Sequence, residues 1–348
     1  MTEPASAAGD RAPLAAYAER IAPHNLAPLW DRLHDLITAH PAGAARPALW
    51  AYDTVRPLLM EAGGLITAHE AERRVLVLEN PGLPGLSRIT TSLYAGLQLV
   101  LPGEIAPAHR HTPTALRFVV DGEGAYTAVE GERTLMREGD FVITPNWAWH
   151  DHGNDSDRPM VWLDGLDIPM VQLFDASFVE PYTDDRQPAA RPLGDSLARY
   201  GSGLLPVETR HRGRTSPILS YPYERTREAL ERMRRNEEWD PHHGLRMRYA
   251  NPLTGDHAMP GIGAFIRLLP KGFATRAYRA TDGTVFSVVE GSGRTELDGE
   301  TLAWKKRDTF VVPSWRRHRH VADEETVLFS FSDRPVQEKL DLWREERG

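Results

Sequence analysis

Two pairs of closely spaced histidines are the residues of this chain whose spacing most clearly suggests chemistry. His109 and His111 are separated by one residue, and His150 and His152 repeat that spacing. Because alternate side chains of a β-strand point to the same face, each pair can direct two imidazoles to one side of a sheet. Imidazoles that converge inside a small barrel are typical of a transition-metal site. The pattern predicts metal binding; the alternative is a set of ordinary surface or core histidines.

Glycine and proline residues stand at defined distances from these histidines. Gly103 precedes His109 by six positions, Gly139 precedes Pro145 by six positions, and His150 follows that proline by five. Glycine and proline mark turns between short strands. The spacing therefore predicts that the histidines lie on strands that begin or end at tight turns.

Part of the chain is repeated. Residues 139–152 resemble residues 307–320 in their Asp, Pro, Trp and two His, and residues 118–124 resemble residues 287–293, at offsets of 168–169. A constant offset indicates that one structural unit was duplicated. Two homologous barrels are therefore expected, joined by a linker.

The second copy lacks the first histidine pair. Tyr278 and Ala280 occupy the positions that the offset predicts, so His318 and His320 remain without partners. One or two imidazoles hold iron poorly, and we expect this barrel to be structural and metal-free. The neighbouring pair 242–243, also histidines, is expected to lie on the surface of the linker.

The composition excludes several classes of protein. The chain has 348 residues, no cysteine and a net charge of −8. Missing cysteines exclude disulfide scaffolds, Fe–S clusters and thiol nucleophiles, and an acidic chain is a poor candidate for nucleic-acid binding. No apolar run approaches the ~20 residues of a membrane span, and the N-terminus lacks the pattern of a secretory signal. A cytoplasmic protein without membrane or nucleic-acid partners is expected.

Short apolar runs separated by turns predict a mostly β fold with a few helices. Strands are expected at 73–78, 92–101, 116–120, 125–129 and 141–143, and again from 261 to 332. Helices are expected at 26–40, at 54–62 with Thr54 as its cap, at 224–238 with Leu230 and Met233 inward, and at 336–346. Four parts follow: an N-terminal helical arm (1–70), a catalytic barrel (71–180), a linker with a helix (181–260) and a structural barrel with a terminal helix (261–348).

The histidine spacings resemble the two motifs of the cupin family, with two departures. Leu116 stands where many cupins have a glutamate ligand, and Trp147 stands where a glycine is usual. Without the glutamate, the ligand set would be three neutral histidines.

Longer segments resemble the gentisate 1,2-dioxygenases, a group that includes salicylate and 1-hydroxy-2-naphthoate 1,2-dioxygenases. They are LYAGLQLVLPGEIAPAHRHT (93–112), ALRFV (115–119), GAYT (124–127) and TPNWAWHDHGN (144–154). The resemblance implies a bicupin fold, two double-stranded β-helix (jelly-roll) barrels with a few peripheral helices, assembled as a homotetramer. It implies one Fe(II) per chain in the N-terminal cupin on His109, His111 and His150. It also implies cleavage of an aromatic hydroxy acid by O₂, giving maleylpyruvate from gentisate.

Charged and polar residues near the histidines are candidates for substrate binding. Arg117 leads a strongly apolar strand, and a planar guanidinium suits a carboxylate; the alternative is a surface arginine. The resemblance places Gln98 and Gly96 in the pocket, and strand alternation puts Tyr94 on the same face. It also assigns a carboxylate contact to Arg73, although the adjacent arginine at position 74 competes for that role.

Two further residues are candidates for supporting roles. His152 is expected to act near the metal without binding it, by hydrogen bonding to the substrate or to oxygen or by moving a proton. Asp164 could orient His152; alternatively it is a turn residue before Gly165.

Several functions remain open at this point. Gentisate is the expected substrate, with salicylate, substituted salicylates or 1-hydroxy-2-naphthoate as alternatives. The hydroxyl of Tyr94 could meet the 5-hydroxyl of gentisate, whereas Gly96 could leave room for other rings. A non-catalytic bicupin that stores or senses a ligand is disfavoured by the three histidines with Arg117 and Gln98. A zinc or manganese cupin isomerase is disfavoured by the missing glutamate.

Overall fold

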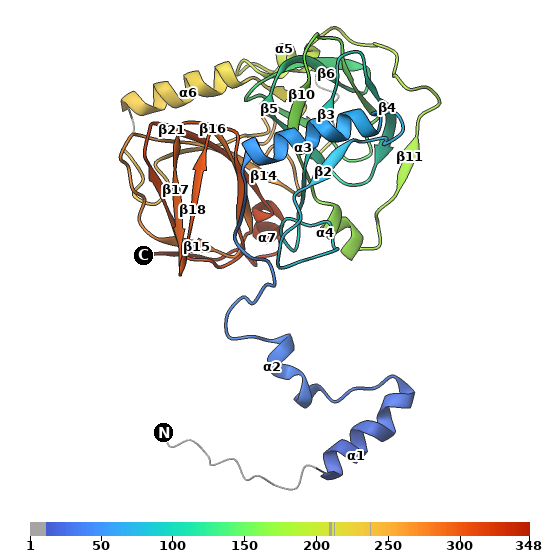
Figure 1. Cartoon of the computed structure of the whole chain (residues 1–348), viewed down its shortest axis with the longest axis vertical. Helices are drawn as coiled ribbons and strands as arrows, with labels where there is room; N and C mark the ends of the chain where they lie inside the picture. The colour runs from blue at the N-terminus through green and yellow to red at the C-terminus, as the bar shows by residue number, and fades with distance from the viewer. Residues whose placement is uncertain (1–11, 209–210, 212, 237) are drawn as a thin grey trace. The chain divides into compact units, whose positions relative to one another are not determined.

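The computed structural model describes residues 12–208, 211, 213–236 and 238–348 (Figure 1). The chain forms two compact units, residues 1–42 and 43–348. Among the helices of the described residues, none is both long enough and apolar enough to cross a membrane.

The described part of the first unit contains only short helices. They are α1 (Ala12–Ile21), the 3₁₀ turns η1 (Ala22–His24) and η2 (Leu29–Asp31), and α2 (Leu33–Leu36). The continuous helix expected at 26–40 is therefore wrong. Pro28 disfavours helical geometry in the residue before it, and no side chain of η2 or α2 is buried. Without packing against a core, short helices of this kind are weakly favoured.

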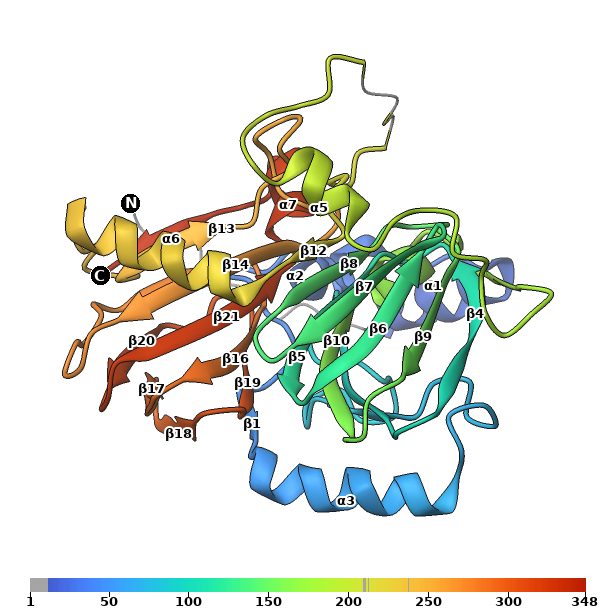
Figure 2. The same ribbon diagram turned by 90° about the horizontal axis from the view of Figure 1, so that it is seen from above.

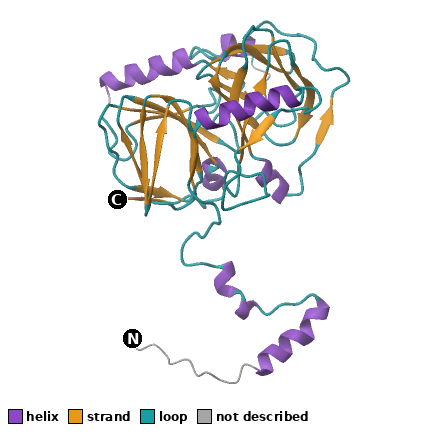
Figure 3. Ribbon diagram, in the orientation of Figure 1, coloured by secondary structure: helices purple, strands orange, loops and turns teal. Residues whose placement is uncertain are grey.

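The second unit contains two barrels that follow one another in the chain (Figure 3). The first barrel has a six-stranded sheet in the order β12-β8-β5-β10-β3-β2 and a five-stranded sheet in the order β11-β4-β9-β6-β7. Its strands are β2 (Val75–Val77), β3 (Tyr94–Val100), β4 (Ile105–His111), β5 (Ala115–Asp121), β6 (Glu123–Val129), β7 (Glu132–Arg137), β8 (Phe141–Thr144), β9 (His150–Asn154), β10 (Met160–Leu166), β11 (Val179–Pro181) and β12 (Ser220–Tyr221).

The second barrel repeats this plan. Its sheets have the orders β1-β19-β16-β21-β14-β13 and β18-β17-β20-β15-β22. Its strands are β1 (Ala48–Trp50), β13 (Leu245–Arg248), β14 (Gly263–Leu269), β15 (Tyr278–Ala280), β16 (Thr284–Glu290), β17 (Ser292–Leu297), β18 (Glu300–Lys305), β19 (Thr309–Val312), β20 (His318–Ala322), β21 (Thr326–Ser332) and β22 (Glu345–Arg347). The duplication and the mostly β fold predicted from the sequence are confirmed.

Each barrel completes its larger sheet with a strand from outside the repeat. β1, which precedes the first barrel, pairs with β19 of the second, and β12 from the linker pairs with β8 of the first. The same hydrogen bond anchors the helix after each strand: Tyr52 N–H donates to Asp308 Oδ1, and Tyr223 N–H donates to Asp140 Oδ1, both at 2.8 Å. The two repeats therefore hold their flanking helices in the same way.

Five helices accompany the barrels, and Figure 2 shows α3 and α6 on different sides. They are α3 (Tyr52–Leu65), α4 (Ile168–Leu173), α5 (Asp195–Tyr200), α6 (Tyr223–Asn236) and α7 (Arg334–Lys339). In α6, Leu230 is buried and Met233 packs against the core, as predicted.

Two helix predictions need correction. α3 begins at Tyr52, not at Thr54, because the bond from the Tyr52 N–H to Asp308 sets its first turn. It also continues through Gly63, where a Cβ would lie 3.1 Å from a Leu99 methyl, so glycine allows the helix to approach the sheet closely. α7 is shorter than expected: it ends at Lys339, and the chain then forms β22, which pairs with β15.

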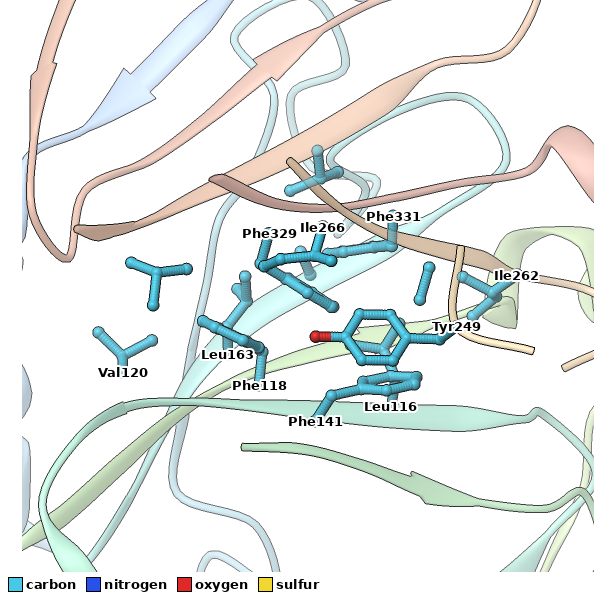
Figure 4. Packing of buried hydrophobic residues seen from close by; sticks show 14 of the residues in the cluster. Leu116, Phe118, Val120, Phe141, Leu163, Tyr249, Ile262, Ile266, Phe329 and Phe331 are labelled. Carbon is cyan, nitrogen blue, oxygen red and sulfur yellow. The ribbon is translucent and has the colours of Figure 1, made fainter. Parts of the chain in front are cut away.

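The two barrels share one hydrophobic core (Figure 4). Along β5, the side chains of Leu116, Phe118 and Val120 join this core, whereas Val119 packs inside the first barrel. The Phe118 ring stacks on Phe329 of the second barrel with 4.1 Å between centroids. Such a pair contributes about 0.5–1.5 kcal/mol beyond the burial of its area. Leu116, the position of the usual glutamate ligand, therefore faces the partner barrel.

Candidate metal centre

The three candidate ligands come from two neighbouring strands of the first barrel. β4 carries His109 and His111, β9 carries His150, and His109 lies directly opposite His150 in the antiparallel pair. One nitrogen of each ring lies within 4.8 Å of the others. The strand alternation expected from the sequence thus brings the three imidazoles together.

Backbone carbonyls fix the orientation of two of these rings. Nδ1 of His111 lies 2.8 Å from the Pro113 carbonyl oxygen, and Nδ1 of His150 lies 2.9 Å from that of Ala148. A carbonyl can only accept, so Nδ1 carries the proton in both rings and Nε2 keeps its lone pair. Nε2 of His150 is buried and has no hydrogen-bond partner in the described part of the chain. A metal ion would satisfy it.

Burial keeps the imidazoles neutral, as metal binding requires. It lowers the pKa of His109 to about 2 and that of His111 to about 4, with nearby Arg73 and Arg117 adding to the effect. The pKa of His150 is also lowered well below its ordinary value, first by burial. The three imidazoles are therefore in their neutral form at neutral pH.

A cavity of about 430 Å³ lies beside the three histidines. Its walls combine charged, polar and apolar side chains: Arg73, Val75, Tyr94, Gln98, His109, His111, Pro113, Ala115, Arg117, His150, Asp164, Leu166, Ile168, Ser177, Phe178 and Val179. A concave site with few polar groups is typical of small-molecule binding. Most of the site residues predicted from the sequence line it; Gly96 and His152 do not.

Arg117 is a buried side chain of the cavity wall, 3 % exposed, and not a surface arginine. Its Nη1 donates to Thr144 Oγ1 at 2.6 Å, and its Nε lies 3.6 Å from Asp164 Oδ1. Burial lowers the pKa of Arg117, and Asp164 opposes this effect. One side of the Arg117 guanidinium is therefore held by Thr144 and Asp164. Its Nη2 makes no hydrogen bond with any described residue.

Arg73 and Arg74 point to different surroundings. Arg73 lines the cavity, with Nη2 3.4 Å from Nε2 of His109. Arg74 is buried outside the cavity, where Nη1 donates to Glu104 Oε1 at 2.8 Å. Of the two candidates, only Arg73 can meet a molecule in this cavity.

Neither role considered for Asp164 holds. Its hydrogen bond and its ion pair join it to Trp162 and Arg117 and not to His152, and it lies within β10 and not in a turn. Its Oδ1 accepts a hydrogen bond from the Trp162 indole at 3.0 Å and faces Arg117. Burial raises the pKa of Asp164 to about 6, while Arg117 and Arg73 hold it down. Its charge therefore balances the two arginines.

His152 lies behind the cavity wall. Its Nδ1 is 3.0 Å from Thr127 Oγ1, and its ring centroid is 5.7 Å from that of His150. Its Nε2 is buried and has no partner among the described residues. The three-histidine group is formed by His109, His111 and His150 and does not include this ring.

The face of β3 that enters the first barrel carries Tyr94, Gly96 and Gln98. Gln98 is buried, and its Nε2 has no hydrogen-bond partner among the described residues. The expectation that Gly96 leaves spare room is wrong: a Cβ there would collide with Val75 and lie 2.9 Å from the Tyr94 hydroxyl. Val75 and the Tyr94 hydroxyl already fill the space beside Gly96. The Tyr94 hydroxyl therefore lies at the cavity wall.

One part of the cavity wall was not anticipated. Ser177, Phe178 and Val179 line the cavity because β11 pairs with β4, with Val179 opposite His111. The Phe178 ring packs on Trp147 at 4.6 Å. No motif in the sequence marks this segment, which lies at the end of the barrel predicted at 71–180.

The unusual tryptophan of the second motif occupies a left-handed backbone position. Trp147 has φ +59°, and Trp315, its equivalent in the other barrel, has φ +63°. This conformation favours glycine, which explains why glycine is usual there. The Trp147 N–H donates to the His111 carbonyl at 2.8 Å, and the Arg110 guanidinium stacks 4.4 Å above the ring.

The second barrel repeats the register without the ligands. Tyr278 lies opposite His318, as His109 lies opposite His150. The prediction that His242 and His243 lie on the surface is wrong, because each is only 7 % exposed. The His243 ring packs against Tyr278 with 4.6 Å between centroids.

Comparisons with known proteins agree on the fold and on the kind of chemistry. The cupin domain family model matches residues 96–166 and 264–331. Gentisate 1,2-dioxygenase 1 of Aquipseudomonas alcaligenes is 61 % identical over 95 % of this chain and 96 % of its own. The 5-aminosalicylate 1,2-dioxygenase of a Comamonas species is 38 % identical over 96 % of this chain and 90 % of its own. A solved structure of salicylate 1,2-dioxygenase from Pseudoaminobacter salicylatoxidans with gentisate superposes with a TM-score of 0.93, at 37 % identity, over 99 % of this chain and 97 % of that chain.

Proposed function

The chain belongs to the gentisate 1,2-dioxygenase family of bicupin enzymes, and from this premise we propose that gentisate is its preferred substrate and Fe(II) its metal. It is a ring-cleaving dioxygenase. The bond between the carboxyl-bearing carbon and its hydroxylated neighbour breaks, and both atoms of O₂ enter the product, maleylpyruvate.

One observation carries this proposal most directly. Three neutral histidines and two arginines face the same cavity of the first barrel. A cation on the histidines and an anion on the arginines would therefore bind side by side. Gentisate has a carboxylate next to a phenol oxygen, and it fits this juxtaposition.

We propose that His109, His111 and His150 hold one Fe(II), which when bound supplies the electronic coupling between the ring and O₂. Around it, the free part of the Arg117 fork binds the substrate carboxylate, with Arg73 beside it. Asp164 moderates the positive charge of the two arginines. Gln98 Nε2 is a buried donor in need of an acceptor and would orient the substrate. The unpartnered Nε2 of His152 supports the site by holding a proton.

Gentisate is expected to have the highest kcat/KM among related aromatic acids. Its 5-hydroxyl donates electron density to the ring, and Tyr94 offers a hydroxyl at the cavity wall. The measurement reconstitutes the protein anaerobically with Fe(II), then follows O₂ uptake and ultraviolet absorbance with gentisate, salicylate, 5-aminosalicylate, 5-chlorosalicylate and 1-hydroxy-2-naphthoate. A higher kcat/KM for salicylate or the naphthoate would contradict the substrate assignment and leave the ring-cleaving reaction intact.

The role of Tyr94 has its own test. Tyr94→Phe should lower kcat/KM for gentisate by roughly 2- to 13-fold, the equivalent of one hydrogen bond of about 0.5–1.5 kcal/mol. For 5-chlorosalicylate it should change little, because that substituent needs no donor. Equal losses for both substrates would show that Tyr94 does not read the 5-substituent.

We also propose that the protein assembles into a homotetramer through its N-terminal unit. No side chain of α1 or α2 is buried, and Leu36 and Ile37 are 68 % and 72 % exposed. Leu29 and Trp30 are exposed as well. Several large apolar side chains exposed within one short segment are typical of a protein interface, and a second copy of the chain is the partner we assign to it.

Deletion of residues 1–42 should therefore reduce the molecular mass of the assembly, as measured by light scattering after size exclusion. Replacing the exposed Leu36 and Ile37 by serine in the full chain should weaken assembly in the same direction, without removing any of the backbone. An unchanged mass for both variants would exclude the arm from the interface.

The division of labour between the barrels follows from these assignments. We propose a catalytic role for residues 71–180 and a structural role for residues 261–348, with 1–70 as the arm and 181–260 as the linker. A cytoplasmic location is part of the same proposal, because a reducing compartment favours ferrous iron.

A further inference from the structure

The interior of the second barrel contains a small cavity of about 20 Å³. This volume is close to the space of a single water molecule or a monatomic ion. Its walls include Arg246, Arg267, Tyr278, Asp282 and His318. The catalytic cavity is about 430 Å³, so an aromatic substrate is far too large for the second one.

Two arginines of this cavity are not neutralised by ion pairs. Arg267 is only 3 % exposed, and its Nε has no hydrogen-bond partner; the Nε of Arg246 is buried and equally unpartnered. Neither guanidinium has an acidic group within ion-pair distance among the described residues. Arg246 and Arg267 also lie directly opposite each other on β13 and β14. Like charges opposite each other on adjacent strands are unfavourable. The guanidiniums lie over the rings of Phe265 and Phe286, which do not neutralise their charge, so burial without an ion-pair partner adds to the cost.

The other polar groups of the cavity offset only part of this charge, with Asp282 as the acidic group that acts on Arg246. Asp282 lines it, but its Oδ1 accepts a hydrogen bond from the Trp343 indole at 2.9 Å, and it forms no ion pair with either arginine. Burial keeps His318 neutral by lowering its pKa to about 4. Tyr278 lines the cavity and makes no hydrogen bond with a described residue through its hydroxyl. Donors and positive charge therefore outnumber acceptors.

These features exclude a metal site and favour the opposite charge. Tyr278 and Ala280 replace the first two histidine ligands of the catalytic barrel. The buried guanidiniums would repel a cation. Guanidinium groups bind anions through strong, charge-assisted hydrogen bonds.

We propose that the second barrel binds one small anion, chloride or a compact oxyanion such as formate, between Arg246, Arg267 and the Tyr278 hydroxyl. The anion stabilises the fold by offsetting part of the charge of two guanidiniums and by accepting their hydrogen bonds. In the first barrel, Arg73 and Arg117 are the pair that we assign to a substrate carboxylate. Arg246 and Arg267 of the second barrel do not occupy the equivalent positions of the repeat, and they hold a permanent structural ligand.

The first test measures thermal unfolding of the iron-loaded full-length protein at constant ionic strength, with chloride or formate replacing gluconate, which is too large for the cavity. Binding to the native state raises Tm by mass action, here by on the order of 5 °C at a hundredfold excess over Kd. Arg267→Met should abolish most of this rise and should itself raise Tm in gluconate, because it removes an uncompensated buried charge. Arg248→Met removes a positive charge from the exposed end of the neighbouring strand β13 and should keep the full rise.

The second test locates the anion. Crystals grown or soaked in bromide should show an anomalous peak between Arg246 and Arg267, and Arg267→Met crystals should lack it. If chloride raises Tm and formate does not, the site takes a monatomic ion; the reverse identifies an oxyanion. An equal rise in Arg267→Met and wild type, or bromide only beside Arg117, would overturn the proposal, because the anion would then act at the catalytic barrel.

Discussion

Replacing His111 with alanine is expected to remove nearly all iron from the protein and to reduce kcat/KM by more than about 100-fold. Mutation of a group that only supports a metal ligand typically lowers metal affinity or activity 10–100-fold. His111 is itself one of three candidate ligands, so its removal should cost more. Two imidazoles would remain, which hold iron poorly. Iron per chain, measured by plasma emission spectroscopy after desalting, should fall from about one to near zero.

Circular dichroism and thermal unfolding should show that the His111→Ala barrel is still folded, since the ring lies at the cavity wall and not in the shared core. His257→Ala provides the matched control. It removes a buried imidazole that pairs with Glu338 in the C-terminal half of the chain. That variant should keep its iron. Stoichiometric iron in His111→Ala would remove this histidine from the ligand set.

Replacing Arg117 with methionine is expected to leave iron binding intact and to lower kcat/KM for gentisate by roughly 30- to 4,000-fold. This range corresponds to about 2–5 kcal/mol, the cost of leaving a buried anion without its hydrogen-bonded partner. Methionine keeps much of the volume of the side chain, so packing inside β5 should survive. Steady-state kinetics on iron-loaded protein give the value directly.

Two variants separate a binding role from a structural one. Arg117→Lys keeps the charge and loses the planar fork, so it should recover only part of the activity. Thr144→Val removes the hydrogen bond that orients Arg117 Nη1 and should cost about 1 kcal/mol, the net worth of one hydrogen bond. If Arg117→Met has normal kinetics, or if it loses iron together with activity, Arg117 does not act as the carboxylate anchor.

Strand periodicity made much of this site predictable. A residue two positions away from another on a strand shares its face, and this rule alone places His109 with His111 and Tyr94 with Gln98. The same rule explains why Leu116 cannot serve as a ligand: its neighbour Arg117 faces the cavity, so Leu116 must face the other barrel. The repeat offset likewise predicted the register of Tyr278 against its histidine.

Contacts between distant segments were not predictable in this way. The role of Asp164 depends on Arg117, which faces it only because β10 pairs with β5 in a register that no local pattern encodes. The segment at Phe178 lines the cavity only because β11 adds to the edge of a sheet. His243 reads as a polar linker residue, yet the tertiary fold buries it against Tyr278. A linker residue can be buried where the linker packs against a barrel, so the exposure of its side chain cannot be predicted from its place in the sequence.

The strand exchange between the repeats has a consequence for biosynthesis and for evolution. The bond that anchors α3 joins residues 256 positions apart, so the segment around β1 must wait for most of the chain to leave the ribosome, at about 5–20 residues per second. Until then, the six-stranded sheet of the first barrel leaves Phe118 and its apolar neighbours without the second barrel that covers them. The second barrel, the product of the gene duplication, packs on that sheet and buries it. The second barrel can lose its metal ligands without penalty, but it cannot be lost itself, because a nascent chain that stops before it is left with half of a hydrophobic core.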